Sequence, residues 1–205
     1  MNTNPILLQE AGPKNPAARA PGLPRAAELA ARRNGIRPSR FFLTVSVAAQ
    51  AMCWFERSRG QRPKGRFPRY ELRRRFVVST SRFGTGQLMQ SNRTPLGLHQ
   101  VVEKVGGGHP IGTIFKGRRP VGLSWQGQPD GMIVHRILWL EGLEPGFNRG
   151  GRVDSYQRFI YIHGYGDEST LGRPQSCGCI HLAAADLMPL YERLPKGTLV
   201  WIAER

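Results

Sequence analysis

A succession of short apolar runs, separated by turns rich in glycine and proline, constrains the fold of this chain more than any other feature. The runs are rich in branched and aromatic residues, which favour β-strands. They predict strands over residues 42–47, 52–56, 75–81, 98–105, 111–115, 132–140, 159–163 and 198–203. One helix stands out late in the chain, with leucine or tyrosine at positions 187, 190, 191 and 194 and a stop at Pro195-Lys-Gly. These elements predict a mainly β fold, a sandwich or barrel with one or two short helices.

Charge divides the chain into a basic front part and a nearly balanced remainder. Residues 1–75 hold 16 Lys or Arg against 4 Asp or Glu, and residues 76–205 hold 14 against 10, which gives the net charge of +16. Residues 1–37 are rich in Ala, Pro and Arg, so we expect a poorly ordered extension with little core, in which 24–33 form a short helix. Residues 38–205 are expected to form the working domain. A basic extension can hold phosphate backbones, anionic lipid or an anionic wall polymer.

The sequence carries few signals of a cellular compartment. No stretch approaches the roughly 20 apolar residues that span a bilayer. Met1–Arg40 shows no secretory signal, because its apolar piece after Pro5 is too short. The three cysteines, Cys53, Cys177 and Cys179, do not make a disulfide framework. Taken alone, these features favour a cytoplasmic protein.

The densest group of reactive side chains lies between His163 and His181. Two thiols flank a glycine in Ser176-Cys-Gly-Cys179, downstream of a predicted strand that ends at His163. A thiol of pKa about 8.5 needs a base to ionise at neutral pH, and a histidine held at a strand end can take its proton. Gly178 permits a tight turn in which its N–H and that of Cys179 face a developing oxyanion. The segment therefore predicts acyl transfer through a thioester.

These motifs resemble those of the L,D-transpeptidase (YkuD-type) catalytic domain. The similarity spans about residues 40–203 and consists of several blocks in the family's order. The blocks are Val78-Ser-Thr-Ser, Thr94-Pro-Leu-Gly, Ile137-Leu-Trp-Leu-Glu-Gly, Asn148-Arg-Gly-Gly, Ile162-His-Gly, Ser176-Cys-Gly-Cys-Ile and, after the helix, Pro195-Lys-Gly-Thr. The resemblance implies a β-sandwich with the site in a cleft beside the helix.

The resemblance also implies a role for each matching position. Cys179 becomes the nucleophile, His163 the base that activates it, and Ser176 and Gly178 shape the turn of the oxyanion hole. The implied reaction is attack on the bond between the third and fourth residues of a peptidoglycan tetrapeptide stem. The terminal D-Ala leaves, and an amine on a second stem, often of diaminopimelate, takes the acyl group. Neither a metal nor an organic cofactor is implied, and nucleic acid is no obligatory partner.

Two positions depart from the family pattern. The family's His before Gly-Cys is Cys177 here, and its Arg or Asn two places after the nucleophile is His181. His181 is mostly neutral at pH 7 and lacks the forked carboxylate binding of arginine. We interpret Cys177, His181 and Arg173 as residues that line the substrate site, with a surface placement equally open for Arg173. Cys177 has three open interpretations: a drifted position, a redox partner of Cys179, or a ligand of a tetrahedral zinc site.

Three functions follow from these residues. The first is a peptidoglycan L,D-transpeptidase, a cysteine acyltransferase of cell wall biogenesis that the two departures weaken or retarget. The second keeps the thioester but uses water as acceptor, which gives an L,D-carboxypeptidase or endopeptidase. The third is an impaired, non-catalytic variant that binds the cell wall, with an anionic wall polymer held by the basic N-terminal part. The resemblance implies the bacterial cell envelope or periplasm, in tension with the missing export signal.

Overall fold

The computed structural model describes residues 22–60, 67–126 and 133–205, which form a mainly β protein with two α-helices. In chain order the helices and strands are α1 (Arg25–Arg33), β1 (Phe41–Ser46), β2 (Ala51–Arg57), β3 (Tyr70–Ser79), β4 (Gly97–Val105), β5 (Thr113–Lys116), β6 (Arg119–Leu123), β7 (Val134–Gly142), β8 (Tyr161–Gly164), β9 (Ile180–Leu182), α2 (Ala184–Arg193) and β10 (Leu199–Ala203). Neither helix in these described ranges is long and apolar enough to cross a membrane. The predicted mainly β fold is confirmed.

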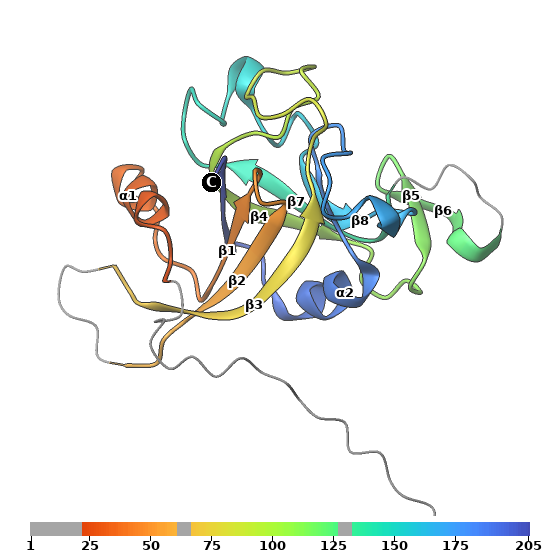
Figure 1. Cartoon of the computed structure of the whole chain (residues 1–205), viewed down its shortest axis with the longest axis horizontal. Coiled ribbons are helices and arrows are strands. Elements are labelled where there is room, and N and C mark those ends of the chain that lie inside the picture. The colour runs from red at the N-terminus through yellow and green to blue at the C-terminus, as the bar shows by residue number, and fades with distance from the viewer. Residues whose placement is uncertain (1–21, 61–66, 127–132) are drawn as a thin grey trace, which may run out of the picture.

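The strands form one closed sheet of mixed direction. Its order is β4-β10-β1-β2-β3-β9-β8-β7-β5-β6, and β4 also pairs with β7, so the sheet closes into a barrel-like sandwich. The pairs β1–β10 and β8–β9 are parallel, whereas the other pairs are antiparallel. Closure leaves β5 and β6 as a hairpin, attached to β7 where Ile114 lies opposite Val134. Figure 1 shows this hairpin at one end of the molecule and α1 at the other.

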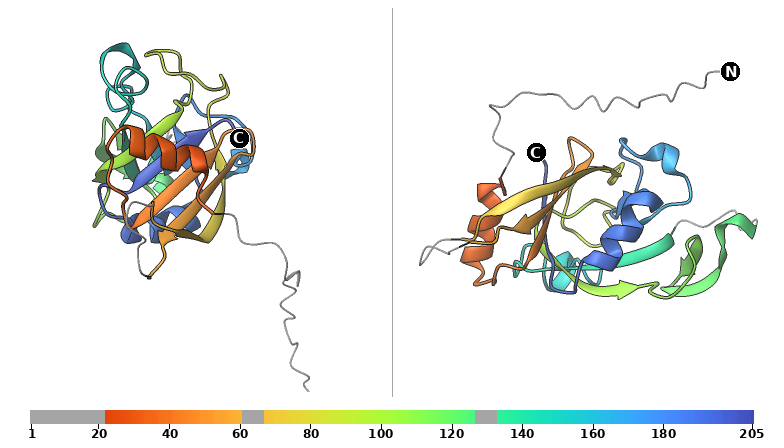
Figure 2. Two further views of the ribbon diagram at one scale, coloured as in Figure 1. Left: turned by 90° about the vertical axis from the view of Figure 1, so that its left-hand side faces the viewer. Right: turned by 90° about the horizontal axis from the view of Figure 1, so that it is seen from below.

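The main core lies within the closed sheet and is filled by alternate residues of its strands. Leu43, Leu138, Ile162 and Ile180 are fully buried there. Burial of each such side chain contributes about 1.5–3 kcal/mol to stability. Helix α2 packs on β7 and β8, and the right-hand view of Figure 2 shows this helix from below. It adds Leu187 and its neighbours to the same core. The strands that carry the reactive segment are therefore among the most firmly packed.

Helix α1 belongs to this packed structure. Its inner face presents Ala27 and Ala31, fully buried in a second cluster with Phe42 and Leu98. Small side chains let the helix lie close to β4, so the expectation of an extension with little core is wrong for this helix. The rest of the expected extension, residues 1–21, lies outside the described residues.

Two strands are not predicted by the sequence. β6 contains Pro120 and Gly122, which are turn signals in a sequence and are tolerated here because β6 lies at the edge of the sheet. β9 is only three residues long and follows the Gly178 turn directly. It joins β3 to β8 in the closed sheet, so a short segment without a strand pattern places the reactive residues.

Candidate active site

The expected base lies on β8, and the expected nucleophile directly precedes β9, the strand that pairs parallel with β8. In the β8–β9 pair, His163 lies opposite His181 and Ile162 opposite Ile180. The two isoleucines point into the main core. Because successive residues of a strand point to opposite faces, the two histidines project from the other face. Cys179, two residues before His181, projects from that same face and packs in a separate, aromatic cluster.

Cys179 is a partly buried free thiol. Its Sγ donates a hydrogen bond to the Phe159 carbonyl at 3.4 Å. Burial raises the pKa of the thiol to about 11, although the backbone N–H of Tyr161 and the charge of Arg158 act in the opposite direction. The thiol is therefore neutral at pH 7.

His163 is buried, and its tautomer is set by one hydrogen bond. Its Nδ1 lies 2.7 Å from the Gly164 carbonyl oxygen. A carbonyl only accepts, so Nδ1 carries the proton and Nε2 keeps its lone pair. Burial lowers the pKa of the imidazole to about 4, so the ring is neutral at pH 7 and can accept a proton at Nε2.

The two groups share a face but are not in direct contact. Among the described residues, no hydrogen bond joins Cys179 to His163. Cys179 precedes β9 and comes two residues before His181, the residue that lies opposite His163. Catalytic hydrogen bonds are often long in an enzyme without substrate and tighten when substrate binds.

The turn before Cys179 is held by Ser176. Its Oγ donates to the Cys179 carbonyl at 2.6 Å and accepts from the Gly178 N–H at 3.2 Å. Gly178 has φ of 119°, and a Cβ there would meet the Arg93 carbonyl oxygen at 3.3 Å, so the position requires glycine. Without substrate, the Gly178 N–H is used inside the turn. Its expected role at an oxyanion stays a prediction, as does that of the Cys179 N–H.

A family comparison connects this geometry with known proteins. The family model of the L,D-transpeptidase catalytic domain (YkuD) matches residues 40–202. The chain belongs to the L,D-transpeptidase catalytic domain family. The resemblance found in the sequence motifs is thereby confirmed. A search of curated proteins found no match to the chain.

Solved structures resemble the chain at low sequence identity. The Bd1075 protein of Bdellovibrio bacteriovorus is 14% identical with a TM-score of 0.52, over 82% of this chain and 49% of that one. An L,D-transpeptidase from Mycobacterium smegmatis is 16% identical with a TM-score of 0.44, over 80% and 58%. L,D-transpeptidase 3 from Mycobacterium tuberculosis, in complex with a faropenem-derived adduct, is 17% identical with a TM-score of 0.45, over 80% and 60%. The chain thus spans about half to three fifths of these proteins.

The two departures from the L,D-transpeptidase motif differ in their surroundings. Cys177 is an exposed free thiol. His181 is buried, with its ring stacked on Tyr165 at 4.4 Å and edge-on to His163 at 4.8 Å between centroids. Burial and the neighbouring His163 lower the pKa of His181 to about 3. The Nδ1 atom of His181 has no hydrogen-bond partner among the described residues. The imidazole ring is uncharged at pH 7.

Arg173 is engaged away from the thiol. Its guanidinium donates to the Ser169 carbonyl at 3.0 Å, within its own exposed loop. The structure thus brings Cys179, His163 and His181 together on one face but leaves Arg173 in this loop. In the part of the chain that the structure describes, no group of three or more His, Cys, Asp or Glu is suited to hold a metal ion.

An aromatic wall beside Cys179 was not expected from the sequence. Trp139 stacks on Tyr156 at 4.2 Å and meets Tyr161 edge-on at 5.3 Å between ring centroids. Phe159 lies 5.7 Å from Trp139 and is 49% exposed. Strand alternation from His163 would have found Tyr161, which shares its side of β8, whereas Phe159 lies in the turn before this strand. Nothing in the sequence indicates that Trp139 joins them.

Arg158 is a further missed residue, placed behind the turn of the nucleophile. Its guanidinium donates to the carbonyl oxygens of Gly86 at 3.1 Å, Gln87 at 2.8 Å and Arg93 at 2.6 Å. Since the Arg93 carbonyl also lies against Gly178, Arg158 holds this loop on the turn. Burial lowers the pKa of Arg158, while the nearby Cys179 raises it.

Three buried histidines make stability depend on pH. Burial lowers the pKa of His99 and His163 to about 4 and, with the charge of His163, that of His181 to about 3. The unfolded chain binds their protons below pH 6.5 and the folded protein does not, so the free energy of unfolding falls as pH falls. We expect a loss of about 2 kcal/mol per histidine at pH 5 relative to pH 7.5, measured by urea unfolding at constant ionic strength.

A matched pair of variants isolates this effect. His99→Gln, outside the site, is expected to lower the pH slope by about one proton, whereas His109→Gln, at an exposed histidine, leaves it unchanged. A free energy of unfolding that is constant from pH 7.5 to pH 5 in the wild type contradicts the prediction.

Proposed function

We propose that the chain is a peptidoglycan L,D-transpeptidase of the cysteine acyltransferase type, in which Cys179 is the nucleophile and His163 the base. The main support is the hydrogen bond from His163 Nδ1 to the Gly164 carbonyl, which leaves Nε2 to accept a proton on the face that carries Cys179. The substrate is the tetrapeptide stem of peptidoglycan, and the acceptor is an amine on a second stem. The proposed place of work is the bacterial cell envelope.

Each proton has a defined path in this proposal. The Cys179 thiol turns from the Phe159 carbonyl and gives its proton to His163 Nε2 as the sulfur attacks the carbonyl carbon of the third stem residue. The Cys179 N–H donates to the oxyanion that forms. The C–N bond then breaks, and D-Ala leaves with the proton from His163. The acceptor amine loses a proton to His163 and attacks the thioester, the C–S bond breaks, and the returning proton regenerates the thiol.

The pKa values support proton transfer during the attack and not before it. With the thiol pKa at about 11 and the imidazole pKa at about 4, an ion pair between them is unfavourable at pH 7. Substrate that displaces water and aligns the Cys179 thiol with His163 makes the transfer concerted with bond formation. The aromatic wall beside the thiol assists by keeping water from the reacting atoms.

Water is the competing acceptor. Cys177 is exposed at the position where the family carries histidine, so solvent reaches the turn beside the thioester. This feature favours an L,D-carboxypeptidase as the second candidate function, with the same nucleophile and base.

Product analysis separates these functions. The wild-type protein is incubated with a tetrapeptide stem and an amine acceptor, and products are identified by mass spectrometry. We expect release of D-Ala together with a cross-linked product. Release of D-Ala with free tripeptide alone supports the carboxypeptidase. Binding of the stem without any D-Ala release contradicts both activities and supports the non-catalytic variant.

A further inference from the structure

Arg118 lies in the turn of the β5–β6 hairpin, with its guanidinium stacked on two aromatic rings. Its Cζ lies 4.8 Å from the ring centroid of Trp139 and 5.2 Å from that of Phe159. Its backbone has φ of 67°, a left-handed conformation that a residue with a Cβ rarely adopts. The turn therefore directs this side chain over the aromatic wall. Within the described ranges, Arg118 has no carboxylate partner.

The residues that hold Arg118 also touch the nucleophile. The Phe159 ring lies under the guanidinium, and the Phe159 carbonyl accepts the hydrogen bond from Cys179 Sγ at 3.4 Å. The charge of Arg118 also acts on the Tyr161 hydroxyl, whose pKa it lowers against the effect of burial, and the Tyr161 backbone N–H approaches the Cys179 thiol. Trp139 is fixed in turn, since its Nε1 donates to the Tyr156 carbonyl at 3.1 Å. Arg118 thus sits on a rigid wall that reaches the thiol.

Other cationic candidates near the site are already engaged or uncharged. The Arg158 guanidinium is taken by backbone carbonyls of the 86–93 loop, and that of Arg173 by its own loop. His181, at the position where the family carries Arg or Asn, is buried and neutral at pH 7. His181 therefore offers no positive charge to a substrate, whereas Arg118 of the hairpin does.

We propose that Arg118 binds a carboxylate of the peptide substrate beside Cys179, an inference that rests on the proposed function. A guanidinium presents two parallel N–H donors to a carboxylate, and stacking on Trp139 and Phe159 fixes the plane of these donors. The rings also lower the dielectric around the ion pair, which strengthens it. Stem tetrapeptides carry the carboxylates that such a site recognises, and the hairpin supplies the cation from the side opposite β9.

Binding to a protein that cannot turn over tests this inference. In a Cys179→Ala background, calorimetry compares a stem tetrapeptide with free carboxylates and the same peptide with its carboxylates converted to carboxamides. We expect Arg118→Gln to weaken binding of the free acid about tenfold to a hundredfold and to leave the carboxamide unchanged. Arg118→Lys keeps the charge without the fork, so it should recover part of the loss.

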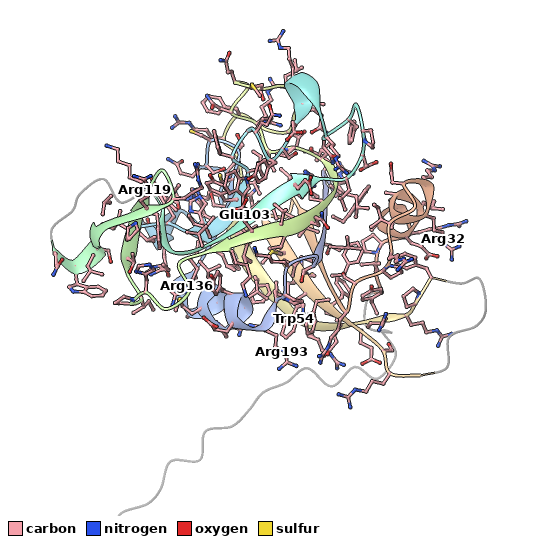
Figure 3. All side chains as sticks on the ribbon, turned by 180° about the vertical axis from the view of Figure 1, so that it is seen from behind. Arg32, Trp54, Glu103, Arg119, Arg136 and Arg193 are labelled. Carbon is pink, nitrogen blue, oxygen red and sulfur yellow. The ribbon has the colours of Figure 1, made fainter. Side chains whose placement is uncertain are left out.

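The neighbouring Arg119 provides a matched control. It is exposed on the same hairpin, at the opposite end of the molecule from Arg32 in Figure 3. Arg119→Gln should leave the dissociation constants of both peptides within about twofold. Equal weakening of both peptides by Arg118→Gln, no effect on either, or no binding of the free acid overturns the inference. Turnover by the wild-type protein is measured in a separate experiment. Binding that depends on Arg118 and on the free carboxylates, without turnover, would contradict the proposed activity but not the role of Arg118.

Discussion

Replacement of Cys179 by alanine is expected to abolish covalent acylation by a carbapenem, whereas Cys177→Ala retains it. A carbapenem carries an activated acyl group that a thiol opens to a thioester. Of the two thiols, Cys179 lies on the face that carries His163, and Cys177 points to solvent. Intact-mass analysis should show one adduct on the wild type and on Cys177→Ala, and none on Cys179→Ala. Peptide mapping should place the adduct on residue 179.

A third variant tests the departure at position 177. Cys177→His restores the family residue, and we expect acylation at least as fast as in the wild type. If the wild type gains no adduct while Cys177→His does, the natural cysteine impairs the site. An adduct that survives Cys179→Ala shows that another group is the nucleophile and contradicts the assignment of Cys179.

Replacement of His163 by glutamine is expected to slow carbapenem acylation by about 10²- to 10⁴-fold, the usual contribution of a general base. The amide cannot take the thiol proton at neutral pH. In the wild type we expect a constant rate between about pH 5 and pH 10, because the imidazole is deprotonated above its pKa of about 4 and the thiol ionises only near 11. Below pH 5 the rate falls as His163 becomes protonated.

The pH profile distinguishes a base from a structural residue. His163→Gln should lose the plateau between about pH 5 and pH 10 and show a rate that rises with pH across this range, as expected for attack by the small thiolate fraction. His109→Gln, at an exposed histidine, should match the wild type in rate and profile. Stopped-flow acylation together with circular dichroism separates chemistry from folding. A plateau that persists between about pH 5 and pH 10 in His163→Gln assigns the base role to another group.

The sequence predicts the strands that have apolar patterns. It does not predict segments whose structure depends on packing against distant parts of the chain. Residues 98–105 and 159–163 have the alternation or branching of strands, and β4 and β8 form there. β9 has no such pattern because its position between β3 and β8 is what makes it a strand. Helix α1 was expected from its composition, but burial of Ala27 and Ala31 depends on a surface that distant residues create.

The site shows the same division between local and distant information. His163 and Cys179 were found from local motifs, since the turn at Gly178 and the end of β8 are set by nearby residues. Arg118 reaches the aromatic wall only because β5 pairs with β7, which positions the hairpin over Trp139. The hydrogen bond from the Gly178 N–H to the Ser176 hydroxyl was not predicted, because the sequence does not show how the turn folds back on itself.

The register of the parallel pair β8–β9 is fixed by hydrophobic packing, and this register also sets the relative positions of His163 and Cys179. A slip of one residue between these strands would exchange Ile180 for Cys179 or His181 and force a polar group into the apolar interior. Burying such a group without a partner costs at least about 1–3 kcal/mol, so the slipped pairing is rare. Packing of Ile162 and Ile180 on one face of the sheet therefore fixes the register of β8 and β9. The same register sets where His163 and Cys179 lie on the other face.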